Sequence, residues 1–214
     1  MCGQQEKSVL KIWGRLTSVN VQKVVWCADE LGLSYERVDA GGKYGIVNTP
    51  EYLAMNPNGL IPVIEHDGFV LWESNAIVRY LAGQFGVGTL WPTDLRVRAD
   101  ADRWMDWQAV SFNPAIGPGF WQLIRTAPEK RDPAVIEAAR DGGEKRLTML
   151  DAHLATREFV AGASFTMGDI PLGCSVDRWY KLPQARETHR HVERWYAELR
   201  KRKGATQVVE LPIA

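Results

Sequence analysis

Strand-like patterns in this chain of 214 residues occur only before residue 73, and this asymmetry limits the folds it can adopt. Up to about residue 86, strand and helix patterns alternate in the order β-α-β-α-β-β-α. Beyond about residue 95, only long stretches with apolar residues at helical spacing remain. The sequence therefore predicts an α/β domain built on a mixed four-stranded sheet, followed by an all-helical domain.

Local signals define the elements of the first half. The run "VLKIW" at residues 9–13 and the segment "YERV" are predicted strands, with a helix between them that ends at Gly32. In "LIPVIEHDGFVLW", Asp67 and Gly68 separate two apolar runs, which predicts an antiparallel hairpin. A last helix follows in "ESNAIVRYLAGQFG", with Ser74 or Asn75 as its cap.

The second half contains helical patterns only. They cover residues 96–124, 133–155, 167–180 and 189–202. We place the boundary at residues 86–92, which gives domains at 1–86 and 92–214.

The segment "FTMGDIPL" has the form of a helix start. Thr166 and Asp169 have the spacing of a capping box, and Phe165 with Ile170 that of a hydrophobic staple. Its role is structural, and loss of either capping residue should cost about 1 kcal/mol.

Composition excludes several classes of partner and site. Lys and Arg number 26, as do Asp and Glu, so no charge excess favours nucleic acid or a membrane surface. The first residues lack the pattern of a signal peptide, which predicts a cytoplasmic protein. Cys2, Cys27 and Cys174 form no disulfide or zinc pattern, and no metal site is expected. A small molecule is the default ligand.

Pro62 stands at the start of a strand pattern, where its missing N–H would interrupt a ladder. It either begins an edge strand in the trans form or follows a cis bond, which occurs at about 5–6% of such positions. In the cis case the N–H and C=O of Ile61 would face outward and could pair with an extended peptide-like ligand.

Glu73 and Ser74 open the helix that follows the hairpin. One interpretation is that Ser74 caps the helix while Glu73 favours its positive end. In the other, the helix N-terminus and the Ser74 hydroxyl bind a ligand carboxylate, and Glu73 accepts from a ligand ammonium. The second arrangement suits the α-amino acid end of a ligand.

Four segments in order, "TSVNVQKV", "NPNGLIPVIEHDG", "LWESNAIVRYLA" and "FTMGDIPL", resemble the cytosolic glutathione S-transferase family. "WGR", "RWMDW" and "LIRTAPEKRD" are similar to a bacterial, serine-type subgroup. The resemblance implies a thioredoxin-like N-terminal domain, an all-helical C-terminal domain, a homodimer and a detoxification role. It also implies that glutathione is the co-substrate. Ile61, before a cis Pro62, would contact the cysteinyl backbone of glutathione, and Glu73 and Ser74 would bind its γ-glutamyl end.

The loop before the first helix carries Thr17, Ser18 and Asn20. A thiol with a pKa of about 8.5 becomes a nucleophile at neutral pH when its thiolate is stabilised. Matching the serine-type members implies that Ser18 donates to the glutathione thiolate and that Asn20 is a second, or even the principal, donor. The alternative is that Ser18 or Asn20 only caps the helix.

The electrophile is expected between the domains, beside the long first helix of the second half. The candidate lining residues are Trp104, Trp107, Phe112, Phe120, Trp121 and Arg125. The aromatic residues also fit a packed core. Arg125 fits either an anionic substrate such as a haloacid or a surface ion pair. The resemblance further implies that Asp102 or Asp106 of a partner chain approaches the γ-glutamyl amine.

The predicted reaction is conjugation of the glutathione thiolate with a small electrophile. Two alternatives remain: a glutathione-dependent dehalogenase, isomerase or lyase at the same thiol site, and a non-catalytic binding protein that keeps the fold.

Overall fold

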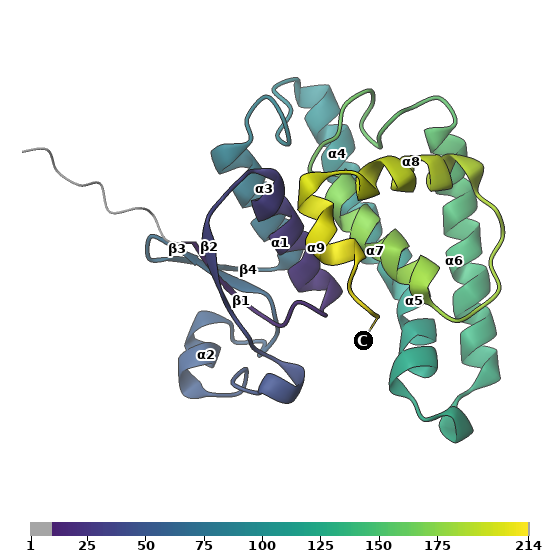
Figure 1. The fold of residues 1–214 in the computed structure, drawn as a ribbon, viewed down its shortest axis with the longest axis horizontal. Coiled ribbons are helices and arrows are strands. Elements are labelled where there is room, and N and C mark those ends of the chain that lie inside the picture. Colours follow the sequence, from purple (N-terminus) through teal and green to yellow (C-terminus); the bar gives the residue numbers. More distant parts are fainter. Residues whose placement is uncertain (1–9, 214) are drawn as a thin grey trace, which may run out of the picture.

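The computed structural model describes residues 10–213 and places a four-stranded sheet beside a bundle of helices (Figure 1). Residue 9 of the first predicted strand lies outside the described residues. The elements of the first half are β1 (Leu10–Trp13), α1 (Val19–Glu30), β2 (Tyr35–Val38), η1 (Gly42–Tyr44), α2 (Pro50–Met55), β3 (Val63–His66), β4 (Phe69–Trp72) and α3 (Ser74–Phe85).

The sheet has the strand order β2-β1-β3-β4. β1 pairs with β2 in parallel and with β3 antiparallel, so that Ile12 lies opposite both Arg37 and Ile64. β3 and β4 form the predicted antiparallel hairpin, and its turn contains Asp67 and Gly68, both with positive φ. The mixed sheet predicted from the sequence is confirmed.

The two faces of the sheet are covered differently. α1 and α3 lie on the face toward the helical half, whereas α2 lies apart from them (Figure 1). On the first face, Leu10, Ile12 and Ile64 belong to a large core that continues into the helical half. On the other, Tyr52 and Val63 form a small core with Ala40.

The helical half confirms the predicted fold class, an α/β part followed by helices. Its elements are α4 (Leu95–Trp107), η2 (Gln108–Phe112), α5 (Asn113–Phe120), η3 (Trp121–Arg125), η4 (Pro128–Lys130), α6 (Pro133–Leu154), α7 (Asp169–Lys181), α8 (Arg190–Arg200), η5 (Lys203–Ala205) and α9 (Thr206–Val209). The sequence patterns missed the short α9.

The predicted helix at residues 96–124 is not one regular α-helix. Two π-helical turns, η2 and η3, flank α5, which contains Pro118. Proline removes a helical hydrogen bond and clashes with the preceding turn, so Pro118 interrupts the regular hydrogen-bond pattern of this segment.

α1 is buried almost all round because it lies between the sheet and the helical half. All its residues from Val19 to Ala28 are buried except Asn20, and it packs against both α3 and α7. None of the helices within residues 10–213 combines the length and the apolarity needed to cross a membrane.

Candidate functional site

The start of α1 is an open helix end. Ser18 occupies the cap position, yet its side chain makes no capping hydrogen bond, and the first turn contains no acidic residue. Within residues 10–213, the side chains of Thr17, Ser18 and Asn20 have no hydrogen-bond partner, and all three are partly exposed. The first N–H groups of a helix have no partner inside it and carry a partial positive charge. This end of α1 is therefore free to bind an anion.

Ile61 lies next to the loop that leads into α1, and the Ile61–Pro62 bond is cis. Neither the N–H nor the C=O of Ile61 bonds to another described residue. Gly14 has φ +147°, and a Cβ on it would lie 2.4 Å from Val21 and 3.3 Å from Ile61. Because Gly14 has no side chain, the loop, α1 and Ile61 can pack this closely.

Glu73 and Ser74 begin α3 in a way that corrects the predicted cap. Glu73, and not Ser74 or Asn75, occupies the cap position, with φ +72° and no side-chain capping bond. A left-handed conformation is unfavourable for glutamate and marks a strained site. Glu73 is exposed, whereas Ser74 is only 6% exposed.

The Ser74 hydroxyl lies inside the first turn of α3 and makes a contact with Lys23 of α1. Lys23 is 2% exposed, and its Nζ donates to Ser74 Oγ (3.3 Å), to Asn75 Oδ1 (3.2 Å) and to Gln108 Oε1 (3.2 Å). Since the Ser74 oxygen accepts this bond, its own hydrogen remains free to donate to a ligand. Burial is the main cause that lowers the pKa of Lys23, to about 8.

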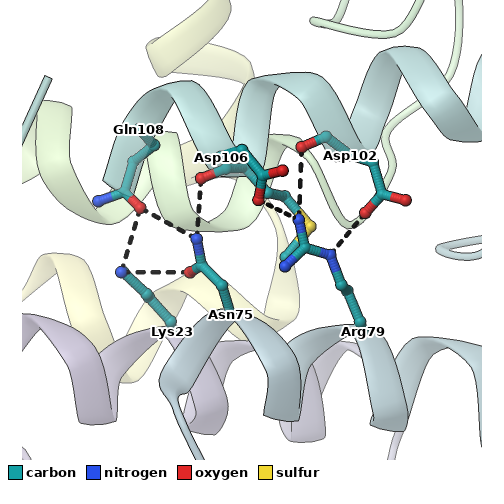
Figure 2. A network of polar contacts seen from close by, with 7 residues as sticks. Lys23, Asn75, Arg79, Asp102, Asp106 and Gln108 are labelled. Atoms are coloured by element: carbon teal, nitrogen blue, oxygen red, sulfur yellow. Dashed lines mark hydrogen bonds and ion pairs between the residues drawn. The ribbon is translucent and has the colours of Figure 1, made fainter. Parts of the chain in front are cut away.

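The Lys23 network joins the two halves of the chain, as Figure 2 shows. Asn75 Nδ2 donates to Met105 O (2.8 Å) and to Gln108 Oε1 (3.3 Å), and Gln108 Nε2 donates to Ser175 Oγ of α7 (2.8 Å). Every polar atom of the Gln108 side chain is thus bonded, and the residue is fully buried. The network fixes the position of the start of α3 relative to the helical half.

Sequence reasoning missed Lys23. The apolar residues Val21, Val24, Val25 and Ala28 define the face of α1 toward the sheet, and Lys23 lies on the opposite side, where a solvated cation is expected. The helical half covers that side.

α1 also links the two parts of the predicted glutathione site. Ser18 and Lys23 are five positions apart, or roughly 7 Å along a helix axis. Lys23 touches Ser74 at the start of α3, and Gly14 of the loop before α1 lies against Ile61. Ser18, Ile61 and Ser74 therefore all lie on α1 or on segments that pack against it or its loop.

The predicted electrophile-pocket residues do not share one place. Phe112 is fully buried and stacks on Trp107. Trp104 and Trp107 line a cavity of about 220 Å³ with Met149 and His153, on the side of α4 that faces α6. Arg125 and Trp121 instead lie next to Phe120: the Arg125 Cζ is 5.7 Å from the centre of the Phe120 ring, and the exposed Trp121 ring is 6.4 Å from it.

The two acidic residues considered for a partner's site have partners in their own chain. Asp102 and Asp106 of α4 both pair with Arg79 of α3, as Figure 2 shows. These ion pairs add a second contact between the two halves.

The sequence predicted no metal site. The described residues contain one group with suitable atoms, Glu144, Glu187 and His189. The Glu144 carboxylate already accepts from Glu187 N (3.1 Å) and lies 2.8 Å from His189 Nε2, which accounts for the cluster as a contact between α6 and the segment before α8. Cys27 and Cys174 are buried and unpaired, burial raises the pKa of both thiols, and Cys2 lies outside the described residues.

Comparison with known proteins identifies the family. Residues 8–83 match the model of the glutathione S-transferase N-terminal domain, and residues 133–198 match that of the C-terminal domain. Glutathione S-transferase GstB of Escherichia coli is 38% identical over 96% of this chain and 100% of its own length. The chain belongs to the glutathione S-transferase family. The predicted family and fold are confirmed.

Two further relatives support this membership. A theta class glutathione S-transferase from the citrus canker pathogen Xanthomonas axonopodis, solved with glutathione bound, has a TM-score of 0.93 and 42% identity, covering 96% of this chain and 99% of its own. The probable glutathione S-transferase GSTF2 of rice is 29% identical over 94% of this chain and 96% of its own length. The likeness to a theta class structure suggests that class, while the serine-type subgroup stays a prediction.

Proposed function

We propose that this transferase joins the glutathione thiolate to a small electrophile and that Ser18 is the thiolate's main hydrogen-bond donor. In this reaction the sulfur forms a bond to the electrophilic carbon, the leaving group departs with its electron pair, and the thiol proton passes to solvent. The relatives of this chain named glutathione S-transferases, one of them solved with glutathione, support the co-substrate.

The γ-glutamyl end of glutathione would bind at the start of α3. Glu73 is exposed and offers its carboxylate to the ammonium group, and the Ser74 hydroxyl donates to the carboxylate. Lys23, behind Ser74, adds a positive charge beneath the same carboxylate. The unpaired N–H and C=O of Ile61 would bond the cysteinyl backbone and direct the sulfur toward α1.

The thiolate would then lie at the open end of α1. A hydrogen bond from a neutral hydroxyl and the positive helix end both favour the anion over the thiol, which lowers the pKa of the thiol. The observation that carries this proposal is the Ser18 hydroxyl, which stands at the cap position with no capping bond to make. Asn20, also without a partner in the described chain, is the second donor.

The test is turnover of a neutral electrophile, chlorodinitrobenzene, by Ser18→Ala and Asn20→Ala, with glutathione affinity measured by calorimetry. Ser18→Ala should lower turnover about 10- to 100-fold, the worth of one charge-assisted hydrogen bond, and change glutathione affinity little. Unchanged turnover in Ser18→Ala, with loss in Asn20→Ala, would transfer the role to Asn20.

The binding assignment has its own control. Glu73→Ala should weaken glutathione binding and reduce the rise in melting temperature that glutathione causes. If the protein does not bind glutathione, or if Glu73→Ala binds it as tightly as the unaltered chain does, the assignment of this end of the site is wrong.

The remaining properties follow from the family. We infer a cytoplasmic homodimer with a role in detoxification. Light scattering of the purified protein tests the oligomeric state. A monomer at micromolar concentration would contradict the dimer.

A further inference from the structure

Three arginines from distant parts of the sequence gather beside the start of α1. Arg15 lies in the loop before α1, and its C=O accepts from Ser18 N (3.1 Å). Arg178 of α7 places its Cζ 4.2 Å from the centre of the Phe120 ring, the same ring that Arg125 approaches to 5.7 Å. Arg178 and Thr17 also line one small cavity, so the α7 arginine reaches the Ser18 loop.

The positive charge of this arginine cluster, Arg15, Arg125 and Arg178, has no counter-charge in contact with it. Within residues 10–213, none of the three guanidinium groups donates a hydrogen bond or pairs with a carboxylate. The carboxylate of the neighbouring Asp177 is already used, by Lys181 Nζ (2.7 Å) and by the Tyr196 hydroxyl (2.6 Å).

Other arginines of the chain behave differently. Several of them pair with acidic groups: Arg79 with Asp102 and Asp106, Arg194 with Glu158, and Arg202 with Glu30. Arg96 and Arg200 also lack an ion pair, but both are exposed, whereas Arg15 and Arg178 are partly buried and lie near a third unpaired arginine.

The guanidinium groups of the cluster lie close enough to repel one another. Burial, together with the charges of Arg125 and Arg15, lowers the pKa of Arg178 to about 10, and burial followed by the charge of Arg125 lowers the pKa of Arg15. Both groups keep their protons at neutral pH. Holding them together costs free energy that a bound anion would offset.

We propose that this cluster binds the acidic group of the electrophile, so that the preferred substrates are small organic acids with a leaving group near the carboxylate. This inference rests on the proposed transferase function. Planar guanidinium forks match a carboxylate geometrically, and the Phe120 ring supplies an apolar wall beside them. A 2-halocarboxylate is the simplest such substrate: glutathione sulfur bonds to the carbon, halide leaves with the bonding electrons, and the thiol proton passes to solvent.

The test compares bromoacetate with bromoacetamide, which have the same leaving group and nearly the same size but differ in charge. Each rate is divided by the uncatalysed rate with glutathione alone. The unaltered protein should accelerate the acid at least ~10-fold more than the amide, and Arg125→Met or Arg178→Met should lower this preference about 10- to 100-fold, mainly through KM. Arg125→Lys should keep part of the preference.

Controls separate the possible causes. Arg140→Met removes one positive charge from α6, where Arg140 pairs with Asp141, and should leave the preference unchanged. Arg125 is exposed, so Arg125→Met should fold normally. Its acid-to-amide preference therefore tests the proposal even if Arg178→Met does not fold. Glutathione affinity is measured in every variant, since glutathione itself carries carboxylates.

Three results would overturn the inference: no preference for the acid in the unaltered protein, an equal loss for acid and amide in the variants, or a large loss of glutathione affinity. The last would assign the cluster to a glutathione carboxylate. Turnover of chlorodinitrobenzene without acid preference would reject only this inference, whereas absence of both glutathione binding and turnover would reject the proposed function itself.

Discussion

The starts of α1 and α7 both carry small polar residues at the N-terminal end of an apolar helix, but their structures are opposite. At α7, the Asp169 carboxylate is fully buried and accepts from Val160 N (3.0 Å), Thr166 N (2.9 Å) and Trp195 Nε1 (2.9 Å). At α1, Ser18 makes no side-chain bond at all. One helix end is closed by its own chain, and the other is left open, which is the difference between a structural cap and a place for a ligand.

Asp169→Ala should give the largest effect, a loss of about 3–5 kcal/mol in the free energy of unfolding, because it leaves several buried donors without an acceptor. This exceeds the roughly 1 kcal/mol that the sequence pattern alone predicted for either capping residue, Thr166 or Asp169. The matched control is Asp94→Ala at the start of α4, where an exposed carboxylate bonds Arg96 N and Val97 N, and where about 1 kcal/mol is expected. Urea unfolding measures both, and equal losses would show that α7 has only an ordinary cap.

The buried charge on α1 gives a second contrast. Lys23 has a pKa of about 8 in the folded protein, below its ordinary 10.5, so the unfolded chain binds more protons between these values. The free energy of unfolding contributed by Lys23 should therefore rise with pH across that window, by up to about 3 kcal/mol, and stay constant below it.

Lys23→Met isolates this contribution. The Cys27 and Cys174 thiols change the free energy of unfolding with pH in the opposite direction, but both thiols are present in both proteins. The difference in unfolding free energy between the two proteins, followed by urea titration from about pH 7 to pH 10, should change with pH as stated. A constant difference would mean that Lys23 is not a buried cation.

Glu73 gives a smaller effect. Its φ of +72° is unfavourable for any residue with a side chain but not for glycine. Glu73→Gly should raise the free energy of unfolding by about 1 kcal/mol while weakening glutathione binding, whereas Glu73→Ala should weaken binding without that gain. Stability that falls in Glu73→Gly would show that the strain is absent.

The sequence predicted the fold because the signals for it are local. Asp67–Gly68 marks the hairpin, and the end of the strand patterns marks the change to helices. Ser18 and Ser74 could also be predicted as candidate site residues, because each lies in a local sequence motif at the start of a helix.

What the sequence did not reveal depends on contacts between distant segments. Lys23 lies on a face of α1 that looks solvated in the sequence, but Gln108 of η2 and helix α7 cover it in the fold. Arg15 and Arg178 are 163 positions apart, and only the packing of α1 on α7 brings them to Arg125. The strain at Glu73 arises where a strand leads directly into a helix, and it cannot be predicted from residue type or spacing.

The most direct test of the open helix end measures two properties of Ser18→Ala: its unfolding free energy and the pKa of bound glutathione, followed by thiolate absorbance. Because Ser18 has no capping bond to lose, stability should change by less than about 0.5 kcal/mol. The thiol pKa should rise by about 1 to 2 units, the worth of one charge-assisted hydrogen bond. A stability loss of about 1 kcal/mol or more with an unchanged thiol pKa would contradict the account, because Ser18 would then be a cap like any other.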